Sequence, residues 1–586
     1  MSKAVDHAYF TRKMFLHSVL PAPLAAIGLA LAEMGDTILV GHAIGMDGLA
    51  AIGFVSPLFL LATFFVFGLS MGGAIVYSNL MHEGKKEDAL GIFNFFLRLA
   101  VLVGVGIAAG GLLWEDHLLL LLGADPENSL VYGMSKSYIF YILLGIPFEI
   151  LMEVFCSYLR NDDADGLSVS IQTAAGAGNV VLSALLLFVF DWGVAGCSFG
   201  FFLSNFFAAC VCLGYILLRP DGGLALGRHT ASLQEAIKPL RLGFATSAEY
   251  IFGAIFTLVS IHLLMNMAGT DGVAVFNVIE NLSLLFIFLY EFIGKTSQPL
   301  FSTFFAECNF AELHRVFRYA LAYSLLLGVL ATALATLCPQ ILDLLFGLDE
   351  IEDTAKVYHA ARLFCIGTIF MGICLLLQNY LQSEEDESSA FLVVFMRQCG
   401  ASLPLAFFLA QFGFYAFWLV YPLAEIITLL TLFAYKRRKG ERKRIEEARI
   451  YAATFLGTSE EVAGQLDAME RFAASWGADS KKRYTLRLLV EEICGFMEEQ
   501  AHPSRGEHIL TQLTLIARED GTFRLHLRNN GDEIDPFRFP GEAMKDISLP
   551  VETEDIRPIV LQVAKKRAHQ VLYRSYHGFN TMVFTV

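Results

Sequence analysis

Charged residues are scarce in this chain of 586 residues. Asp, Glu, Lys and Arg together make up 17% of the sequence, hydrophobic residues make up 55%, and the mean hydropathy is +0.55. Average soluble domains carry about 25% charged residues, so a wholly soluble protein is excluded. The composition is that of a polytopic membrane protein.

Two motif classes are also missing. The ten cysteines show neither CxxC nor the spacing of metal ligands, and most of them fall inside apolar runs. They are interpreted as small packing residues, so no metal site is expected. The chain also lacks a GxxxxGK[ST] loop, which excludes ATP hydrolysis of the P-loop type. No resident cofactor is expected.

Long apolar runs are what the sequence has instead. A helix that crosses a membrane needs about 20 mostly apolar residues, and twelve such runs are predicted. They cover residues 13–41, 50–80, 90–113, 135–160, 166–189, 193–218, 239–268, 273–302, 314–337, 358–382, 389–411 and 413–435. The predicted fold class is therefore a polytopic α-helical membrane protein with twelve transmembrane helices.

Basic residues gather on one side of these runs. They lie in the connections after even-numbered runs and end with KRRKGERKR from Lys436, whereas the other connections are acidic or nearly free of Lys and Arg. Because Lys and Arg stay on the cytoplasmic side, both termini are expected in the cytoplasm and the chain in the plasma membrane. The first run has full length and no small-residue cleavage site, so no cleaved signal peptide is expected.

The membrane region contains a weak internal repeat. A shift of 224 residues lays GMDGLAAI, from Gly45, on GTDGVAVF, from Gly269. The match continues without a gap over about 40 positions, which is the kind of repetition found in transporters. We therefore predict an N lobe of residues 1–218 and a C lobe of residues 219–435, each with six helices, enclosing a central cavity.

The first two helices resemble those of a known family. The segment from Pro21 through LAEMGDTILVGHAIGMDGLAAIGFVSPLF to SNLMHEGKKEDA is similar to the multidrug and toxic compound extrusion (MATE) transporters, and Asn179 in GAGNVVLSALLLFVFDWGVAGCS is similar to the Asn of that family's fifth helix. The resemblance covers residues 13–435. It implies a secondary antiporter, not an enzyme, that expels small organic compounds while a proton or Na⁺ moves inward and the lobes rock.

Asp36 is the first candidate for ion coupling. It lies in LALAEMGDTILVGHA, which is otherwise apolar except for Glu33. A charged carboxylate within a membrane costs about 2.5–3.5 kcal/mol, and burial favours its protonated form, so this group can take up and release a proton. The resemblance implies that Asp36 and Asn179 form the coupling site. The alternative is a helix-terminal polar residue near the outer interface, satisfied by Thr37 or water.

The sequence departs from the family at two expected ligand positions. Ser183 stands where the fifth helix commonly has an Asp, and Phe201 stands where a Thr often follows the sixth-helix glycines. Because a sodium cage needs several oxygen ligands, these departures favour protons over Na⁺.

Other acidic residues are candidates for the substrate cavity, where they would suit cationic aromatic compounds. These candidates are Glu33, Glu149, Glu249 and Glu280. Each has a competing interpretation. Glu149, with Glu153, could face Arg160, and the essential Glu of some family members falls one turn after Glu249, at Gly253.

Two more intramembrane acid patterns are open to interpretation. Glu280, flanked by Asn277 and Asn281, could point into the cavity or into the packed lobe. Glu291 and Lys295 stand four residues apart, a spacing that favours a neutralising pair on one helix face.

The last part of the chain is a different kind of sequence. Residues 436–449 are predicted to be a basic juxtamembrane linker, and residues 450–586 a cytoplasmic domain read as helix, helix, strands, helix, strands. The segments VEEICGFMEE and LRNNGDEIDPF resemble the boxes of the histidine-kinase-like ATPase fold, an α/β sandwich, in its anti-sigma-factor-like branch.

The resemblance implies a degenerate nucleotide site. Glu492 is kept, but Phe496 replaces the magnesium-binding Asn and Asn529 replaces the adenine-binding Asp, although Gly531 remains. The expected glycine-rich lid reads EDIRPIVLQ. Without metal ligand and phosphate loop, phosphoryl transfer is not expected, nor are ATP and magnesium as cofactors. A regulatory or scaffolding domain is predicted, which could bind a cytoplasmic protein partner. Weak nucleotide binding at Asn529 and Gly531 is left open.

Three functions are compatible with the sequence. The first is a proton-coupled (or Na⁺-coupled) multidrug antiporter that binds small organic substrates within the bilayer. The second is a flippase for a lipid-linked compound, which would need a basic cavity, whereas Arg98 and Lys295 are the clearest intramembrane cations. The third is a membrane sensor with a signalling domain, which would need a phosphoacceptor helix or an intact nucleotide site. Nucleic acid is not an expected partner.

Overall fold

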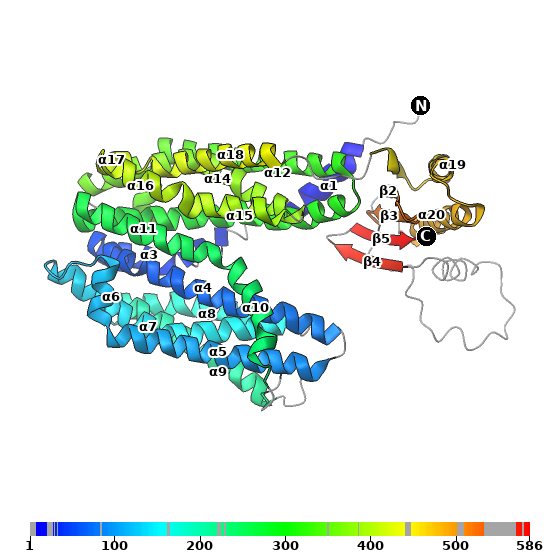
Figure 1. Cartoon of the computed structure of the whole chain (residues 1–586). Coiled ribbons are helices and arrows are strands. Elements are labelled where there is room, and N and C mark those ends of the chain that lie inside the picture. The colour runs from blue at the N-terminus through cyan, green and yellow to red at the C-terminus, as the bar shows by residue number, and fades with distance from the viewer. Residues whose placement is uncertain are drawn as a thin grey trace.

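The structure is a computed structural model that describes most of the chain. It describes residues 7–576 and 579–586, except 20–26, 29, 32, 83–84, 161–164, 219–223, 225, 228–229, 348–350, 385, 440–446, 501–508 and 532–569. Figure 1 shows two helical lobes with a small domain beyond one end of them. We refer to that end of the lobes as the domain end and to the opposite end as the distal end.

The N-terminal half is built from long apolar helices with short connections. Its elements are α1 (His7–Val19), α3 (Gly35–Ile44), α4 (Met46–His82), α5 (Lys86–Leu113), α6 (Glu115–Leu122), α7 (Ser129–Arg160), α8 (Asp165–Phe188) and α9 (Val194–Leu218). The first predicted span, 13–41, is divided between α1 and α3 in the described residues. The short α6 in the connection after α5 was not predicted.

The second half repeats this plan. Its elements are α10 (Leu233–Thr246), α11 (Ala248–Ala306), α12 (Phe310–Leu337), α13 (Gln340–Phe346), α14 (Ile351–Ser383), α15 (Glu387–Phe395), the π-helical turn η1 (Met396–Gly400), α16 (Ser402–Ala410), α17 (Phe414–Phe417) and α18 (Val420–Lys439). A positive φ of 62° at Gly269 kinks the 59-residue α11, which therefore supplies two passes. The short α13 was not predicted.

Ten helices in the described part of the chain are long and apolar enough to cross a membrane. One of them is the kinked α11, and the first predicted span falls partly outside the described residues. The polytopic helical fold is therefore confirmed, while the count of twelve spans stays a prediction.

The backbone confirms the internal repeat. Gly45 and Gly269, which the 224-residue shift superimposes, both have positive φ, at 82° and 62°. The same shift relates Gly123, with φ 97°, to Gly347, with φ 65°, and both end the short distal helices α6 and α13. Glycine is favoured there because a side chain strains this conformation.

The lobes exchange their first half-helices. α1, from the N-terminal repeat, packs on α11 and α12 of the C lobe, while α10, its counterpart in the second repeat, packs on α4 of the N lobe. Figure 1 shows the dark blue α1 beside α12 and the green α10 crossing the blue lobe. The bounds 1–218 and 219–435 stay predictions, and each repeat places its first helix, α1 or α10, against the other lobe.

The lobes meet at the distal end. A side chain at Gly41 in α3 would place its Cβ 2.2 Å from the carbonyl oxygen of Phe346 in α13, so the two helices are in close backbone contact. The His42 ring contacts the Leu344 carbonyl oxygen at 2.9 Å. The repeated short helix α13 therefore closes one lobe onto the other.

The C-terminal domain is a two-layer α/β structure. Its elements are β1 (Ile450–Leu456), α19 (Ser459–Ser475), α20 (Ser480–Gln500), β2 (Leu510–Ala517), β3 (Phe523–Asn529), β4 (Gln570–Tyr576) and β5 (Phe579–Thr585). The strands form one antiparallel sheet in the order β1-β2-β3-β5-β4. Leucines of β2 and β3 pack on α19 and α20 in one apolar core.

Two of these strands are corrections to the predicted layout. The predicted domain began with a helix, but it begins with β1 at Ile450. Strand β4 was not predicted, and its first residue, Gln570, is the last residue of the helix predicted over 558–570, whose other residues lie outside the described part of the chain. Strand β1 pairs with β2, about 60 residues further along the chain, so its own sequence marks it weakly, whereas β4 forms a hairpin with the following β5. The likeness to the histidine-kinase-like ATPase fold stays a prediction.

Candidate functional site

Asp36 lies in the first turn of α3, against α8. Its Oδ2 accepts a hydrogen bond of 3.4 Å from the Asn179 amide, and the Ser183 hydroxyl donates to Asn179 Oδ1, also at 3.4 Å. Asp36 Oδ1 is buried and has no hydrogen-bond partner among the described residues. The two predicted coupling residues are therefore adjacent, and one carboxylate oxygen between them is left bare.

Close helix packing makes this contact. A Cβ at Gly35 would lie 2.7 Å from Val180 Cγ2, so only glycine allows α3 to approach α8 this closely without movement. The helix begins after Met34, which makes no side-chain capping bond. Asp36 is therefore oriented by a neighbouring helix of the same lobe.

The two departures from the MATE pattern have different consequences. Ser183 is buried and bonds Asn179 as well as the Cys197 carbonyl, at 3.3 Å. Phe201 packs edge-on against Phe59, with ring centres 5.7 Å apart. Ser183 thus takes part in the polar chain behind Asp36, whereas Phe201 belongs to the aromatic packing of α9.

The remaining N-lobe candidates form an acidic group. Glu33, which is exposed, Glu149 and Glu153 are close enough to interact electrostatically. Glu153 is neutralised by Arg160 at 3.2 Å and accepts from Gln172 at 2.5 Å. Among the described residues, Glu149 Oε2 is buried without a hydrogen-bond partner. Glu153 therefore faces Arg160, whereas Glu149 does not share that pair.

Glu280 lies where the two lobes touch. Its carboxylate accepts hydrogen bonds from Thr257 in its own α11, at 2.6 Å, and from Ser56 in α4 of the other lobe, at 2.8 Å. Ser56 and Glu280 are 224 residues apart, the repeat spacing. Equivalent positions of the two repeats thus meet across the pseudo-twofold axis. The contact between Ser56 and Glu280 was not predicted, although the 224-residue shift superimposes these two positions.

The other C-lobe acids have local partners. Glu291 and Lys295 form the predicted pair at 2.5 Å, with Lys295 well exposed. Glu249 is near Gln378 and feels the charges of Glu291 and Arg397. Glu249 and Glu280 thus have partners other than Asp36 and Asn179.

The most buried cation of the membrane region, among the described residues, was not predicted. Arg397 lies in the π-helical turn η1, and its Nε donates to Glu425 of α18 at 2.8 Å, with both side chains largely buried. Arg98, predicted to be a clear intramembrane cation, is exposed and donates to the Gly227 carbonyl. An Arg within the apolar run 389–411 indicates a buried cation. Its partner could not be predicted, because Glu425 lies 28 residues further along the chain on another helix.

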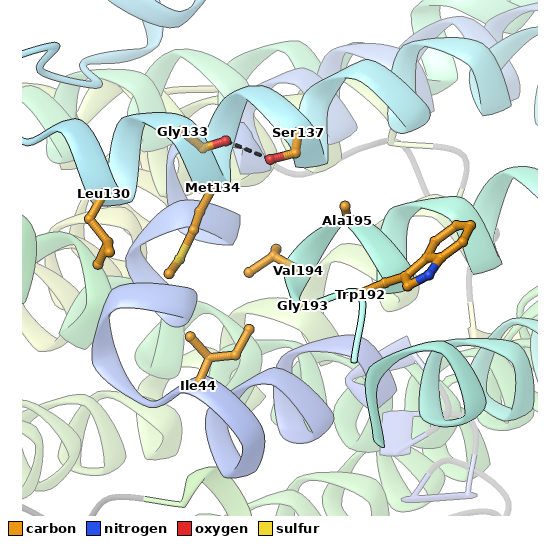
Figure 2. A pocket seen from close by; sticks show the side chains of 9 residues that line it. All are labelled: Ile44, Leu130, Gly133, Met134, Ser137, Trp192, Gly193, Val194 and Ala195. Carbon is orange, nitrogen blue, oxygen red and sulfur yellow. Dashed lines mark hydrogen bonds between the residues drawn. The ribbon is translucent and has the colours of Figure 1, made fainter. Parts of the chain in front are cut away.

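A pocket of about 430 Å³ opens at the distal end of the N lobe. Figure 2 shows Ile44, Leu130 and Met134 around it, with the Ser137 hydroxyl bonded to the Gly133 carbonyl. Its lining is mostly apolar, and none of the acidic candidates belongs to it. Its position therefore gives no support to the predicted substrate residues.

The predicted nucleotide residues are held by internal contacts. Phe496 belongs to the apolar core between α20 and the sheet, next to Met497, and Glu492 lies one turn earlier on α20. Asn529 Oδ1 accepts from the Gly531 backbone and from the Asn580 amide, both at 3.1 Å. The acceptor that would have to read adenine is thus already occupied.

Comparisons with known proteins concern the membrane region. A family model described as MatE matches residues 21–189 and 243–408, together more than half of the chain. The "Probable multidrug resistance protein YoeA" of Bacillus subtilis (strain 168) is 20% identical over 450 residues, which cover 73% of this chain and 94% of that protein. The "Multidrug export protein MepA" of Staphylococcus saprophyticus is 23% identical over 211 residues, 36% of this chain and only 46% of that protein.

Solved structures share the fold. An inward-facing multidrug resistance MATE family transporter of the MOP superfamily superposes with a TM-score of 0.65 at 19% identity, covering 70% of this chain and 94% of that one. An outward-facing structure with the same description gives a TM-score of 0.56, covering 75% and 98%.

Proposed function

This chain belongs to the MATE family of multi-pass membrane transporters, and from that premise we propose that it is a proton-coupled antiporter that expels cationic organic compounds. The multidrug transporters among its relatives support export of small molecules.

The bare oxygen of Asp36 carries this proposal. An unsatisfied buried polar atom costs about 1–3 kcal/mol, and here the atom belongs to a carboxylate, which a proton would convert to a donor with no net charge. Asn179 fixes the other oxygen. Proton uptake would remove the charge that resists closing the lobe, so the protonated and unprotonated forms favour different arrangements of the helices.

Proton coupling agrees better with the local ligands than Na⁺ coupling does. A sodium ion takes several oxygen ligands in a tight shell. Beside Asp36 lie an amide that donates its NH₂ to the carboxylate and a hydroxyl already bonded to Asn179 and Cys197. Phe201 adds a ring where an oxygen was expected.

The acidic group on the N lobe supports a cationic substrate class. Glu33 and Glu149 interact electrostatically with each other, and the neighbouring Glu153 is the member that Arg160 neutralises. A desolvated organic cation gains attraction from such carboxylates and from aromatic faces. A cationic dye such as ethidium is therefore a suitable probe.

A flippase for a phosphorylated lipid is disfavoured by the same charges. Recognition of a pyrophosphate needs free cationic groups. The buried cation that the structure reveals, Arg397, is committed to Glu425, and Lys295 is committed to Glu291.

Ethidium uptake into inverted membrane vesicles tests the proposal. Vesicles containing the wild-type chain should accumulate the dye when a pH gradient is imposed, and a sodium gradient should give no added uptake. Asp36→Asn should lower the proton-driven rate more than about tenfold. Glu127→Gln, which changes an exposed acid at the distal end, is the matched control. Sodium-driven uptake, or an unaffected Asp36→Asn, would refute proton coupling at this residue.

For the soluble domain we infer a regulatory role without catalysis. The helix that carries Glu492 and Phe496 packs on one face of an antiparallel sheet, an arrangement compatible with a degenerate histidine-kinase-like ATPase fold. Phe496 cannot bind magnesium, and Asn529 is engaged by Gly531 and Asn580. The domain is therefore proposed to act through what it contacts.

A further inference from the structure

The second face of the C-terminal sheet is polar and buried. Side chains alternate along β2 and β3, so the leucines that face α19 and α20 leave another set pointing away from those helices. That set includes Gln512, Thr514, His526 and Arg528, each at most 4% exposed. A polar sheet face is normally wet, so its burial shows that another part of the chain covers it.

The covering element is the domain end of the C lobe. Arg528 forms an ion pair with Glu307, which directly follows α11, and both side chains are almost completely buried. The guanidinium also lies 4.9 Å from the centre of the Phe304 ring and donates to Gln512 at 2.8 Å. Leu510 of β2 belongs to the apolar core of the membrane region. The domain is thus docked by charge and by packing.

The same end of the C lobe holds α1. The Thr11 hydroxyl donates to Glu312 Oε2 at 2.5 Å, while Arg315 pairs with Glu312 Oε1 at 2.6 Å. Phe15 packs on Tyr319 of α12, with ring centres 5.8 Å apart. α1 also contacts β1 of the soluble domain. The half-helix is therefore held by both the C lobe and the domain (Figure 1).

This arrangement links the domain to the predicted coupling site. α1 packs on the C lobe, whereas the start of α3, with Asp36, packs on α8 of the N lobe, and only the distal end of α3, at Gly41, touches α13 of the C lobe. A movement that parts the lobes at the distal end would therefore shift Asp36 relative to α1. A domain that strengthens the attachment of α1 stabilises the present arrangement of the lobes against that movement.

We propose that the soluble domain is an intramolecular clamp, which docks through Arg528 and Glu307, holds α1 on the C lobe and thereby slows the transport cycle. Release of the domain frees α1 and speeds exchange between the two states of the lobes. The effect on rate rests on the proposed transport function, whereas the effect on α1 does not.

Hydrogen exchange of the full-length chain tests the clamp. Arg528→Met removes the charge and keeps apolar bulk, and it should raise amide exchange in α1 and β3 by about tenfold. Arg487→Met is the matched control, because Arg487 of α20 pairs with Asp467 and Glu470 of α19 at the surface of the domain. This variant should leave amide exchange in α1 unchanged. Faster exchange in β3 with an unchanged α1 would overturn the proposal.

A second variant excludes misfolding of the domain as the cause. Glu307→Gln breaks the same pair from the membrane side and leaves the sequence of the soluble domain intact. It should free α1 and β3 while the core helices α19 and α20 keep their protection. If α1 stays protected in Glu307→Gln, the clamp is refuted.

Transport by the same variants tests the effect on rate. Ethidium uptake under a pH gradient should rise about two- to tenfold in Arg528→Met and Glu307→Gln, because the stabilised state loses population. Unchanged or slower uptake with a freed α1 would overturn the braking role. Absence of uptake in every variant, wild type included, would instead refute the proposed transport function, and hydrogen exchange would then decide the clamp alone.

Discussion

At the level of single residues, the carboxylate of Asp36 is bound on one side and bare on the other. The Asn179 amide holds Oδ2, and Oδ1 is buried with no donor among the described residues. Fully bonded carboxylates are stable as anions and are typical structural acids, whereas a buried oxygen without a donor, which Asp36 shares with Glu149 and Glu425, favours protonation. Glu153, bonded by Arg160 and Gln172, is an example of the structural kind.

His526 is the residue at which pH should act on the soluble domain. Burial, and to a smaller extent the nearby arginines, lower the pKa of His526 to about 3. The groups that face it are Arg524 and Arg528 of β3, Arg518 after β2 and Glu307 after α11. At a pH below about 6.5, the ordinary pKa of histidine, His526 binds a proton when the domain is released and stays neutral when the domain is docked.

Acidification should therefore favour release of the domain: the equilibrium constant for release should rise by up to about tenfold for each pH unit below 6.5. The measurement is amide exchange of β3 in the wild type relative to His526→Gln at each pH, because the ratio cancels the pH dependence of exchange chemistry. The ratio should rise as the pH falls from 7.5 to 5.5. A constant ratio would show that His526 does not titrate on release.

At the level of elements, the approach of α3 to α8 depends on Gly35. An added methyl group would lie 2.7 Å from Val180 Cγ2, and overpacking of this kind costs about 1–3 kcal/mol. Gly35→Ala should therefore displace Asp36 from Asn179 and lower proton-driven ethidium uptake by about tenfold. Gly176→Ala, on α8 but with open space around its Cβ, should transport like the wild type.

The sequence predicted the elements that have a local signature. The apolar runs marked the long helices, and the paired glycines Gly45 and Gly269 marked the repeat. The division of the first span into α1 and α3, the short helix α13 and the strand β4 were missed. Helix α13 and the separation of α1 from α3 depend on contacts with distant parts of the chain, which hydrophobic periodicity does not report, whereas β4 is the edge strand of a local hairpin with β5.

The contacts between charged and polar residues were also predicted only in part. Asp36 and Asn179 were predicted as a pair because the family pattern supplies both, although they lie on different helices. The Arg397–Glu425 pair and the Arg528–Glu307 pair were not predicted. Nothing in the sequence relates two charges that are far apart along the chain, so only the fold could bring these partners together.

At the level of the whole molecule, the two repeats and the domain form one connected structure. The repeats exchange α1 and α10, they touch through Ser56 and Glu280, and the domain is docked on the C lobe at Glu307. The proposed regulation therefore acts through these contacts and needs no chemistry of the domain's own.

Nucleotide binding by the full-length chain should accordingly be absent. With Phe496 in the core and Asn529 bonded to Asn580, the site lacks the metal ligand and the free acceptor that ATP requires. Calorimetric titration with ATP and magnesium should show no binding in the micromolar range. Metal-dependent micromolar binding would mean that the domain is an active ATPase-like module.

Proton release on substrate binding is the most direct test of the central claim. The purified chain, in weakly buffered solution with a pH indicator and at a pH low enough for Asp36 to be protonated, should release about one proton per protein when ethidium binds, because substrate and proton favour different states of the transporter. The Asp36→Asn variant should bind ethidium and release none. Equal proton release from the wild type and Asp36→Asn would contradict the account, since the exchanged proton would then come from another group.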